Sequence, residues 1–344
     1  MGPRRIAAII GLTAWTVAVA PSGAGATDMG RLTITEENDA FASKDDRHYT
    51  QGLRLAYLSP DLARTSGWNR PFDFLSRVLP LFPGRGEDST RKIETIIGQS
   101  MFTPTNLHLA NPDPKDRPYA GWLYGGASLM QNNNAHQLEN VELLLGVVGP
   151  GAMASEAQDS FHSFLQLRTP PAGWSHQLRN EPGLALSYDG KLRYEYRLIS
   201  NVAVDAIPEA GATIGNVFTY GQLGGTLRFG QNLAADFGAV HIRPSLSGSG
   251  WFDAERMTSP LGWYLFVGAQ GRAVGRNIFL DGNTWHDGPS VAKKTLVGDL
   301  AFGAAVFWTD IMRVDFTVTN RSKEFSGQKS TDRFGMINLA VLFW

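Results

Sequence analysis

Two polar side chains lie one helical turn apart in the middle of the chain. Gln158 and His162 are four residues apart within Ala154–Leu167, a stretch predicted to form an amphipathic helix, so both face the same side of it. A neutral imidazole can take a proton from water, and a neighbouring amide can orient the ring or the water. The pair therefore indicates a general base, His162, assisted by Gln158. The alternative is a solvated surface histidine with no part in chemistry.

A second polar group interrupts a strand-like alternation near the start of the chain. Asn38 and Asp39 offer amide and carboxylate oxygens, which suit calcium, and Thr50 and nearby backbone carbonyls could add further ligands. The alternative is turn chemistry, because asparagine and aspartate side chains often bond their own backbone. The remaining histidines are scattered without the spacing of a zinc site, and there is no G-x-S-x-G motif of a serine hydrolase.

The elements that must position these groups are mostly strands. Glycine is frequent (38 residues), aromatic residues make up 11% of the chain, and many short segments alternate between apolar and polar residues, which is typical of a β-barrel. The predicted strands after the opening one are Gly52–Leu58, Ile93–Met101, Trp122–Leu129, Val141–Val148, Leu192–Ile199, Val217–Phe229, Leu233–Ile242, Trp263–Val274, Leu296–Trp308, Ile311–Thr319 and Phe334–Trp344.

Two helices are predicted outside this pattern. Trp68–Asp88 is expected to be a long loop with a short amphipathic helix. The mid-chain helix follows a break at Gly149–Gly151, and Ser155 with Gln158 fits a capping box. A lone amphipathic helix in a barrel sequence is expected to lie in a loop, plug the lumen or pack against the wall.

The two ends of the chain indicate where the barrel is located. Residues 1–26 have the pattern of a secretory signal peptide: two arginines, an apolar run and a small-residue cleavage site after Ala26. The apolar run is short for a membrane-spanning helix, although a retained anchor is the alternative. The last strand ends on Trp344, and pairing it with the first strand would close the sheet and leave no open edge in lipid. Residues 27–344 are therefore predicted to form one outer-membrane barrel domain.

Composition excludes several other classes. With 31 basic and 32 acidic residues, the chain has no basic excess that would indicate a nucleic-acid partner. It has no cysteine, which excludes disulfides, a thiol nucleophile and a thiolate metal site.

Three spaced motifs and the terminal aromatic strand resemble a known family. The motifs "END-F----DR-YT-G", "DRPYAGWLYGG" and "GVVGPGA----AQ---H" occur in order over most of the chain, and the likeness is to the LpxR family of outer-membrane lipid A 3′-O-deacylases. The resemblance implies an all-β, transmembrane antiparallel β-barrel of about 12 strands, with a short helix in a loop packed near the wall. It also implies a site between wall and helix near the outer leaflet, a calcium (Ca2+) cofactor, and lipid A, as part of lipopolysaccharide, as substrate.

The family's functional residues fall on positions already singled out. Its asparagine–aspartate pair falls on Asn38 and Asp39, its threonine on Thr50, and its helical glutamine and histidine on Gln158 and His162. The implied reaction is calcium-dependent hydrolysis of the 3′-linked acyloxyacyl ester. We expect a monomer, inserted by the barrel assembly machinery through the C-terminal strand.

Three features keep alternatives open. Arg117 in the Asp116-Arg117 motif could give the substrate a cation, or could form an internal Asp–Arg ion pair. Leu109-Ala110 stands where the family pattern has a lysine–arginine pair, and Arg168 stands where it has a glutamate. The alternatives are therefore another outer-membrane lipase or phospholipase, or an inactive barrel or porin of the same architecture.

Overall fold

A computed structural model describes residues 29–42, 48–134, 136–164, 171–199, 201–245, 249–308 and 311–343. For residues 161–164 and 343 it describes the backbone alone. The predicted signal peptide, Arg168 and Trp344 lie outside these ranges. Within them, no helix is long and apolar enough to cross a membrane.

The described residues form one antiparallel sheet that closes on itself. Its strands are β1 (Gly30–Asn38), β2 (His48–Leu58), β3 (Ser89–Thr103), β4 (Ala120–Asn133), β5 (Gln137–Val148), β6 (Glu181–Leu192), β7 (Tyr194–Ile199), β8 (Val202–Ile214), β9 (Phe218–Gln231), β10 (Leu261–Asn277), β11 (Leu296–Trp308), β12 (Met312–Arg321) and β13 (Asp332–Phe343).

Two pairings complete the barrel. β1 pairs with β13, and β6 pairs with β8. β7 continues β6 beyond Arg193 in the same register against β8, so the two segments act as one broken strand. The described strands therefore make a closed barrel of 12, which confirms the predicted fold class.

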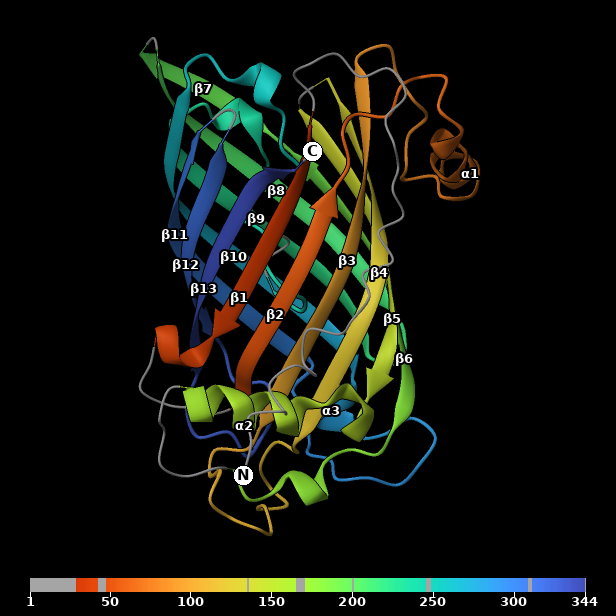
Figure 1. Cartoon of the computed structure of the whole chain (residues 1–344), viewed down its shortest axis with the longest axis vertical. Coiled ribbons are helices and arrows are strands. Elements are labelled where there is room, and N and C mark those ends of the chain that lie inside the picture. The colour runs from red at the N-terminus through yellow and green to blue at the C-terminus, as the bar shows by residue number, and fades with distance from the viewer. Residues whose placement is uncertain are drawn as a thin grey trace, which may run out of the picture.

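The barrel has two different rims. Gly30 lies opposite Phe343, so the start of β1 and the end of β13 meet at one end of the barrel, which we call the terminal rim. Helix α1 (Arg70–Val78), in the loop between β2 and β3, lies near this rim (Figure 1). Helix α2 (Ala154–Phe164) lies across the outside of the wall at the opposite end, which we call the α2 rim (Figure 1).

Side-chain alternation separates a lipid-facing exterior from a polar interior. On β2, Leu53 and Leu55 are exposed on the outer face, whereas Arg54 between them is buried and bonds Glu94 of β3 at 2.6 Å. An apolar outer band with a polar interior is the arrangement expected for a membrane barrel.

The lumen is filled by the chain itself. Residues 232–245 and 249–260, which we call the lumen segment, turn back from the terminal rim into the interior, where residues 236–242 are almost entirely buried. The predicted strand Leu233–Ile242 is wrong: the segment forms a 3-10 turn (Leu233–Ala235), one isolated bridge from Asp236 to Phe252, and a positive φ at Gly238. Its apolar residues are buried inside the barrel, as Phe237 is among Leu58 and Met130 of the wall, although they form no strand.

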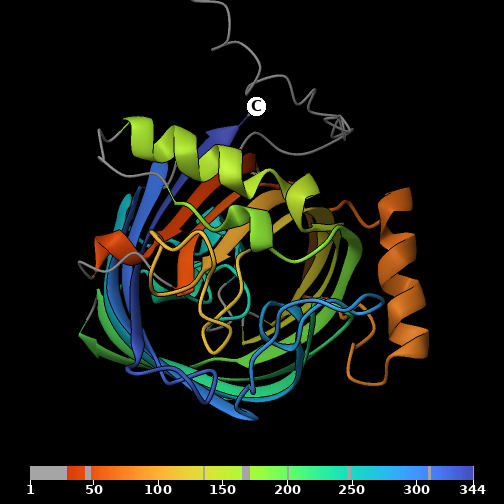
Figure 2. The same cartoon turned by 90° about the horizontal axis from the view of Figure 1, so that it is seen from below.

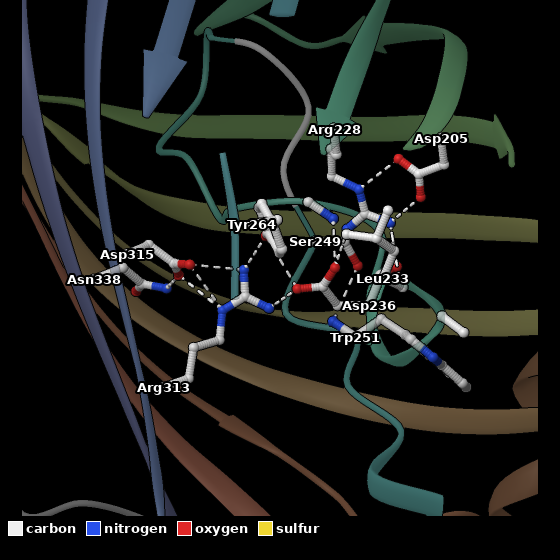
Figure 3. Close-up of polar contacts among 12 residues, drawn as sticks. Asp205, Arg228, Leu233, Asp236, Ser249, Trp251, Tyr264, Arg313, Asp315 and Asn338 are labelled. Atoms are coloured by element: carbon white, nitrogen blue, oxygen red, sulfur yellow. Dashed lines mark hydrogen bonds and ion pairs between the residues drawn. The ribbon is translucent and has the colours of Figure 1, made fainter. Parts of the chain in front are cut away.

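Buried ion pairs hold this segment in place. Asp236 receives hydrogen bonds from both Arg228 of β9 and Arg313 of β12 (Figure 3). Each arginine also bonds a second carboxylate, Asp205 for Arg228 and Asp315 for Arg313. The lumen segment therefore links strands that are not neighbours in the sheet.

An aromatic layer fills the lumen near the α2 rim. Helix α3 (Ile278–Asp281) turns inward there, and Phe279 stacks on Phe102 with ring centroids 4.0 Å apart. Phe218 packs against both Phe279 and Trp122. This layer gives the wall beneath α2 a rigid backing.

Candidate functional site

Helix α2 packs on the exterior of the wall, outside β3 and β4. Both views show it spanning the rim from the side of β5 toward the 3-10 turn η2 (Asp39–Phe41) at the end of β1 (Figures 1 and 2). Ala154 packs with Met101 and Trp174, and Gln99 Nε2 donates to the carbonyl of Ala152 at 2.6 Å. The structure therefore places the helix against the wall, one of the three locations expected from sequence.

A glycine allows this close approach. A Cβ on Gly121 of β4 would lie 2.5 Å from Ala154 Cβ and 3.0 Å from Ala152 Cβ, which real structures do not tolerate without a shift. By contrast, a Cβ on Gly125 of the same strand would come no closer than 3.6 Å to a carbonyl oxygen.

We expect Gly121→Val to displace α2 and to lower the activity proposed below by roughly 10²-fold, the cost typical of a catalytic group misplaced by about 1 Å. Gly125→Val is the matched control and should retain activity. Deacylation by folded protein of both variants is the measurement. Equal activity of the two variants would show that the position of α2 does not matter.

Gln158 has a fixed orientation and one unused donor. Its side chain is 1% exposed, and its Oε1 accepts a hydrogen bond from Trp174 Nε1 at 2.8 Å. An indole nitrogen can only donate, so the carbonyl of the amide must face Trp174 and the NH₂ group must point away. That Nε2 is buried with no hydrogen-bond partner among the described residues. A buried donor without an acceptor is costly, which makes it a candidate for binding a reacting oxygen.

This contact replaces the expected capping box, because Gln158 Oε1 bonds an indole sixteen residues away. The backbone of His162 lies in α2 as predicted, one turn after Gln158. Its side chain lies outside the described part of the structure, so its role as a base stays a prediction.

Asn38 and Asp39 lie at the α2 rim, where β1 ends. Asn38 is the N-cap of η2, and its Oδ1 accepts from the backbone N–H of Ala40 at 2.8 Å. The turn chemistry considered as the alternative is therefore present. It does not exclude a second role, since an amide oxygen has two lone pairs. Both side chains are buried, and Thr50 Oγ1 lies 2.6 Å from Thr103 Oγ1 on the neighbouring strand.

The sequence analysis missed Glu36. It shares the outward face of β1 with Asn38 and with the exposed Ile34, yet its Oε1 accepts from Gln51 Nε2 at 2.7 Å, and it also hydrogen-bonds the Asn38 side chain. A carboxylate accepts, so the Asn38 amide nitrogen is the donor. The clue was a run of polar residues at positions where the barrel pattern demands apolar ones.

The residues at this rim fit calcium by their donor chemistry. The Glu36 and Asp39 carboxylates, the Asn38 amide and the Thr50 hydroxyl are all hard oxygen donors. Within the described ranges, no group of three or more histidine, aspartate or glutamate side chains is arranged to hold a metal ion.

Arg117 lies in an internal ion pair. Its side chain is buried, and its Nη2 donates to Glu324 Oε2 at 2.6 Å. An internal ion pair is therefore present, but its carboxylate comes from Glu324 and not from an aspartate as expected. Asp116 lies 3.4 Å from His48 Nε2 and accepts from the backbone N–H of Thr105. Burial raises the pKa of Asp116, but these hydrogen bonds outweigh it and lower the pKa to about 2. Substrate binding by Arg117 remains a prediction.

Comparison with known proteins places these features in a family. The family model described as "Outer membrane protein LpxR" matches residues 7–343. The solved structure of LpxR from Salmonella typhimurium is similar, with a TM-score of 0.70 and 20% identity, over 91% of this chain and 100% of that chain.

Two further solved structures are more distant. The β domain of the Bordetella autotransporter BrkA has a TM-score of 0.42 and 9% identity, over 92% of this chain and 100% of that chain. An outer membrane channel from Pseudomonas putida F1 has a TM-score of 0.43 and 10% identity, over 94% of this chain and 100% of that chain. No curated protein matches the sequence. From the family match over nearly its whole length, the chain belongs to the LpxR family of outer-membrane proteins.

Proposed function

We propose that this protein hydrolyses the 3′-linked acyl (acyloxyacyl) ester of lipid A in the outer leaflet of the outer membrane. The observation that carries the proposal is the Gln158 amide, buried at the outer side of the wall, whose NH₂ group has no partner among the described side chains. Family membership supports the choice of substrate.

His162 and Gln158 have different roles in the proposed reaction. His162 takes a proton from water as the water oxygen bonds to the acyl carbon, and then returns a proton to the 3′ oxygen as the ester C–O bond breaks. Gln158 Nε2 donates a hydrogen bond to the ester oxygen that gains negative charge, and its carbonyl contact with Trp174 holds it in that orientation.

Asn38, Asp39 and Thr50 would hold calcium, and Glu36 keeps the Asn38 amide oriented through their hydrogen bond. Calcium held by these residues would supply positive charge to polarise the ester carbonyl.

The exterior position suits a lipid substrate. The polar positions of β1 at the α2 rim continue directly from the exposed, lipid-facing Ile34 of the same strand. An acyl chain can therefore lie along the apolar outer face while its ester reaches the polar residues beneath α2.

Mass spectrometry of lipid A from cells with and without the protein tests this proposal. We expect the loss of one 3′-linked acyloxyacyl group. Gain of an acyl chain would indicate an acyltransferase, and release of phospholipid fatty acids with lipid A unchanged would indicate a phospholipase. Either result would overturn the proposal.

Calcium dependence is tested separately with purified protein. We expect chelation to abolish deacylation, because it would remove the ion that Asn38, Asp39 and Thr50 are proposed to hold. Adding calcium back should restore activity, whereas magnesium should restore less, because it demands stricter octahedral geometry. Full activity in the presence of chelator would rule out the metal role while leaving the hydrolase assignment open to the lipid A measurement.

A further inference from the structure

Helix α1 lies outside the barrel with its axis in the plane of the membrane. Figure 1 shows it nearly end-on beside the wall near the terminal rim, and Figure 2, viewed along the barrel, shows it lengthwise. Its axis is therefore roughly perpendicular to that of the barrel. A helix in this orientation can rest along a membrane surface.

One face of α1 is fixed to the wall. Phe72 is fully buried and packs with Phe82 and with Val141 of β5. Asp73 accepts from Arg91 of β3 at 2.8 Å, and the Arg91 guanidinium lies over the Phe72 ring. The helix is thus a firmly placed element of the structure.

The opposite face is apolar but exposed. On α1 itself Phe74 is 62% and Val78 56% exposed, and in the segments that flank the helix Trp68 is 45% and Leu81 64% exposed. Several large apolar side chains exposed on one short element indicate a surface that meets an apolar partner.

The position of α1 along the wall identifies that partner. Val141 of β5 lies beneath the helix, and the next outward residues toward the α2 rim, Leu143 and Leu145, are exposed. On β6, Tyr188 packs against the α1 cluster, and the next outward residues are again exposed: Leu186 and Leu184. The helix therefore marks the edge of the lipid-facing band, which is the level of the lipid headgroups.

Charge on the same face fits those headgroups. Arg70 and Arg77 are exposed, and the i, i+4 and i+7 spacing places them beside Phe74 on one stripe of the helix. Apolar residues flanked by arginines are typical of helices that lie in the interface of an anionic membrane.

We propose that α1 is an interfacial anchor. Phe74 and Val78 insert into the phospholipid leaflet on the terminal side, and Arg70 and Arg77 contact the phosphates of anionic phospholipids. The choice of leaflet follows from placing α2 in the lipid A leaflet, as proposed above. The contact with lipid follows from α1 alone.

Site-directed spin labelling tests the anchor directly, because the chain has no cysteine of its own. A nitroxide is attached at Phe74→Cys in vesicles of phosphatidylcholine and phosphatidylglycerol, and its collisions with oxygen and with a water-soluble nickel chelate are compared. Leu143→Cys on the wall is the lipid reference, and Asp287→Cys, exposed in the loop after α3, is the water reference. Gel mobility before and after heating shows that each variant is folded.

We expect the oxygen-to-nickel ratio at Phe74 to approach that of Leu143 and to exceed that of Asp287 severalfold. A ratio equal to that of Asp287 would overturn the proposal, as would shielding from both reagents, which would indicate a protein partner. Removing phosphatidylglycerol should lower the ratio, and Arg70→Gln combined with Arg77→Gln should abolish this lipid dependence. A dependence that persists in the double variant would refute the phosphate contacts. No activity is measured, so failure here would leave the proposed function intact.

Discussion

His162→Ala is expected to lower the rate of lipid A deacylation by roughly 10²- to 10⁴-fold, the usual cost of removing a general base. The reason is that the amide of Gln158 is no base, so it cannot take over the proton from water when the imidazole is removed. Purified, folded variant and parent protein are compared by mass spectrometry of lipid A over time.

The control for this prediction is His176→Ala. His176 lies in the same long loop between β5 and β6 and is exposed, so its loss should leave the rate nearly unchanged. A His162→Ala protein that keeps more than about a tenth of the parent rate would reject the base assignment, because that loss is below the 10²-fold minimum expected.

Asp236→Ala is expected to destabilise the barrel by about 3–5 kcal/mol, the cost of removing one partner from a buried charge network. The substitution leaves two buried arginines, Arg228 and Arg313, with one carboxylate partner fewer, and also removes an acceptor from Tyr264. The free energy of unfolding, measured by urea titration in detergent micelles, should show the loss.

Asp253→Asn gives a matched comparison within the same lumen segment. Asp253 pairs with Arg256 in a partly exposed contact, and asparagine can still cap the following turn. Such pairs contribute about 0–1 kcal/mol. Similar losses for the two substitutions would show that the network around Asp236 does not anchor the lumen segment.

The sequence predicted the barrel and both named helices because their patterns are local. Alternation marked most strands, and α2 begins at Ala154 as expected. Two strands, β6 and β8, were not predicted. The inward positions of β6 include Asp189 and Lys191, so charged residues interrupt its apolar pattern. The inward positions of β8 include Asp205 and Glu209, which form lumen ion pairs, and its outward positions include Pro208 and alanines. The segment after β9 was mistaken for a strand because burial inside a lumen produces the same apolar pattern as a wall.

Only the part of the site that depends on residues close together in the sequence was predicted. The four-residue spacing placed Gln158 and His162 on one helix face, but nothing local shows that Trp174 would orient the Gln158 amide. Glu36 was overlooked for a related reason. Its position looks like lipid-facing wall until α2, more than a hundred residues later in the chain, is found covering that rim.

The filled lumen has a consequence for the cell that makes the protein. Beside His241, two spaces among the buried side chains measure about 10 and 20 Å³, room for roughly a water molecule each. Nutrients and antibiotics that diffuse through open barrels are far larger than that. At this level of the lumen the described side chains therefore leave such molecules no path, so abundant synthesis of the barrel would not open the outer membrane to them there.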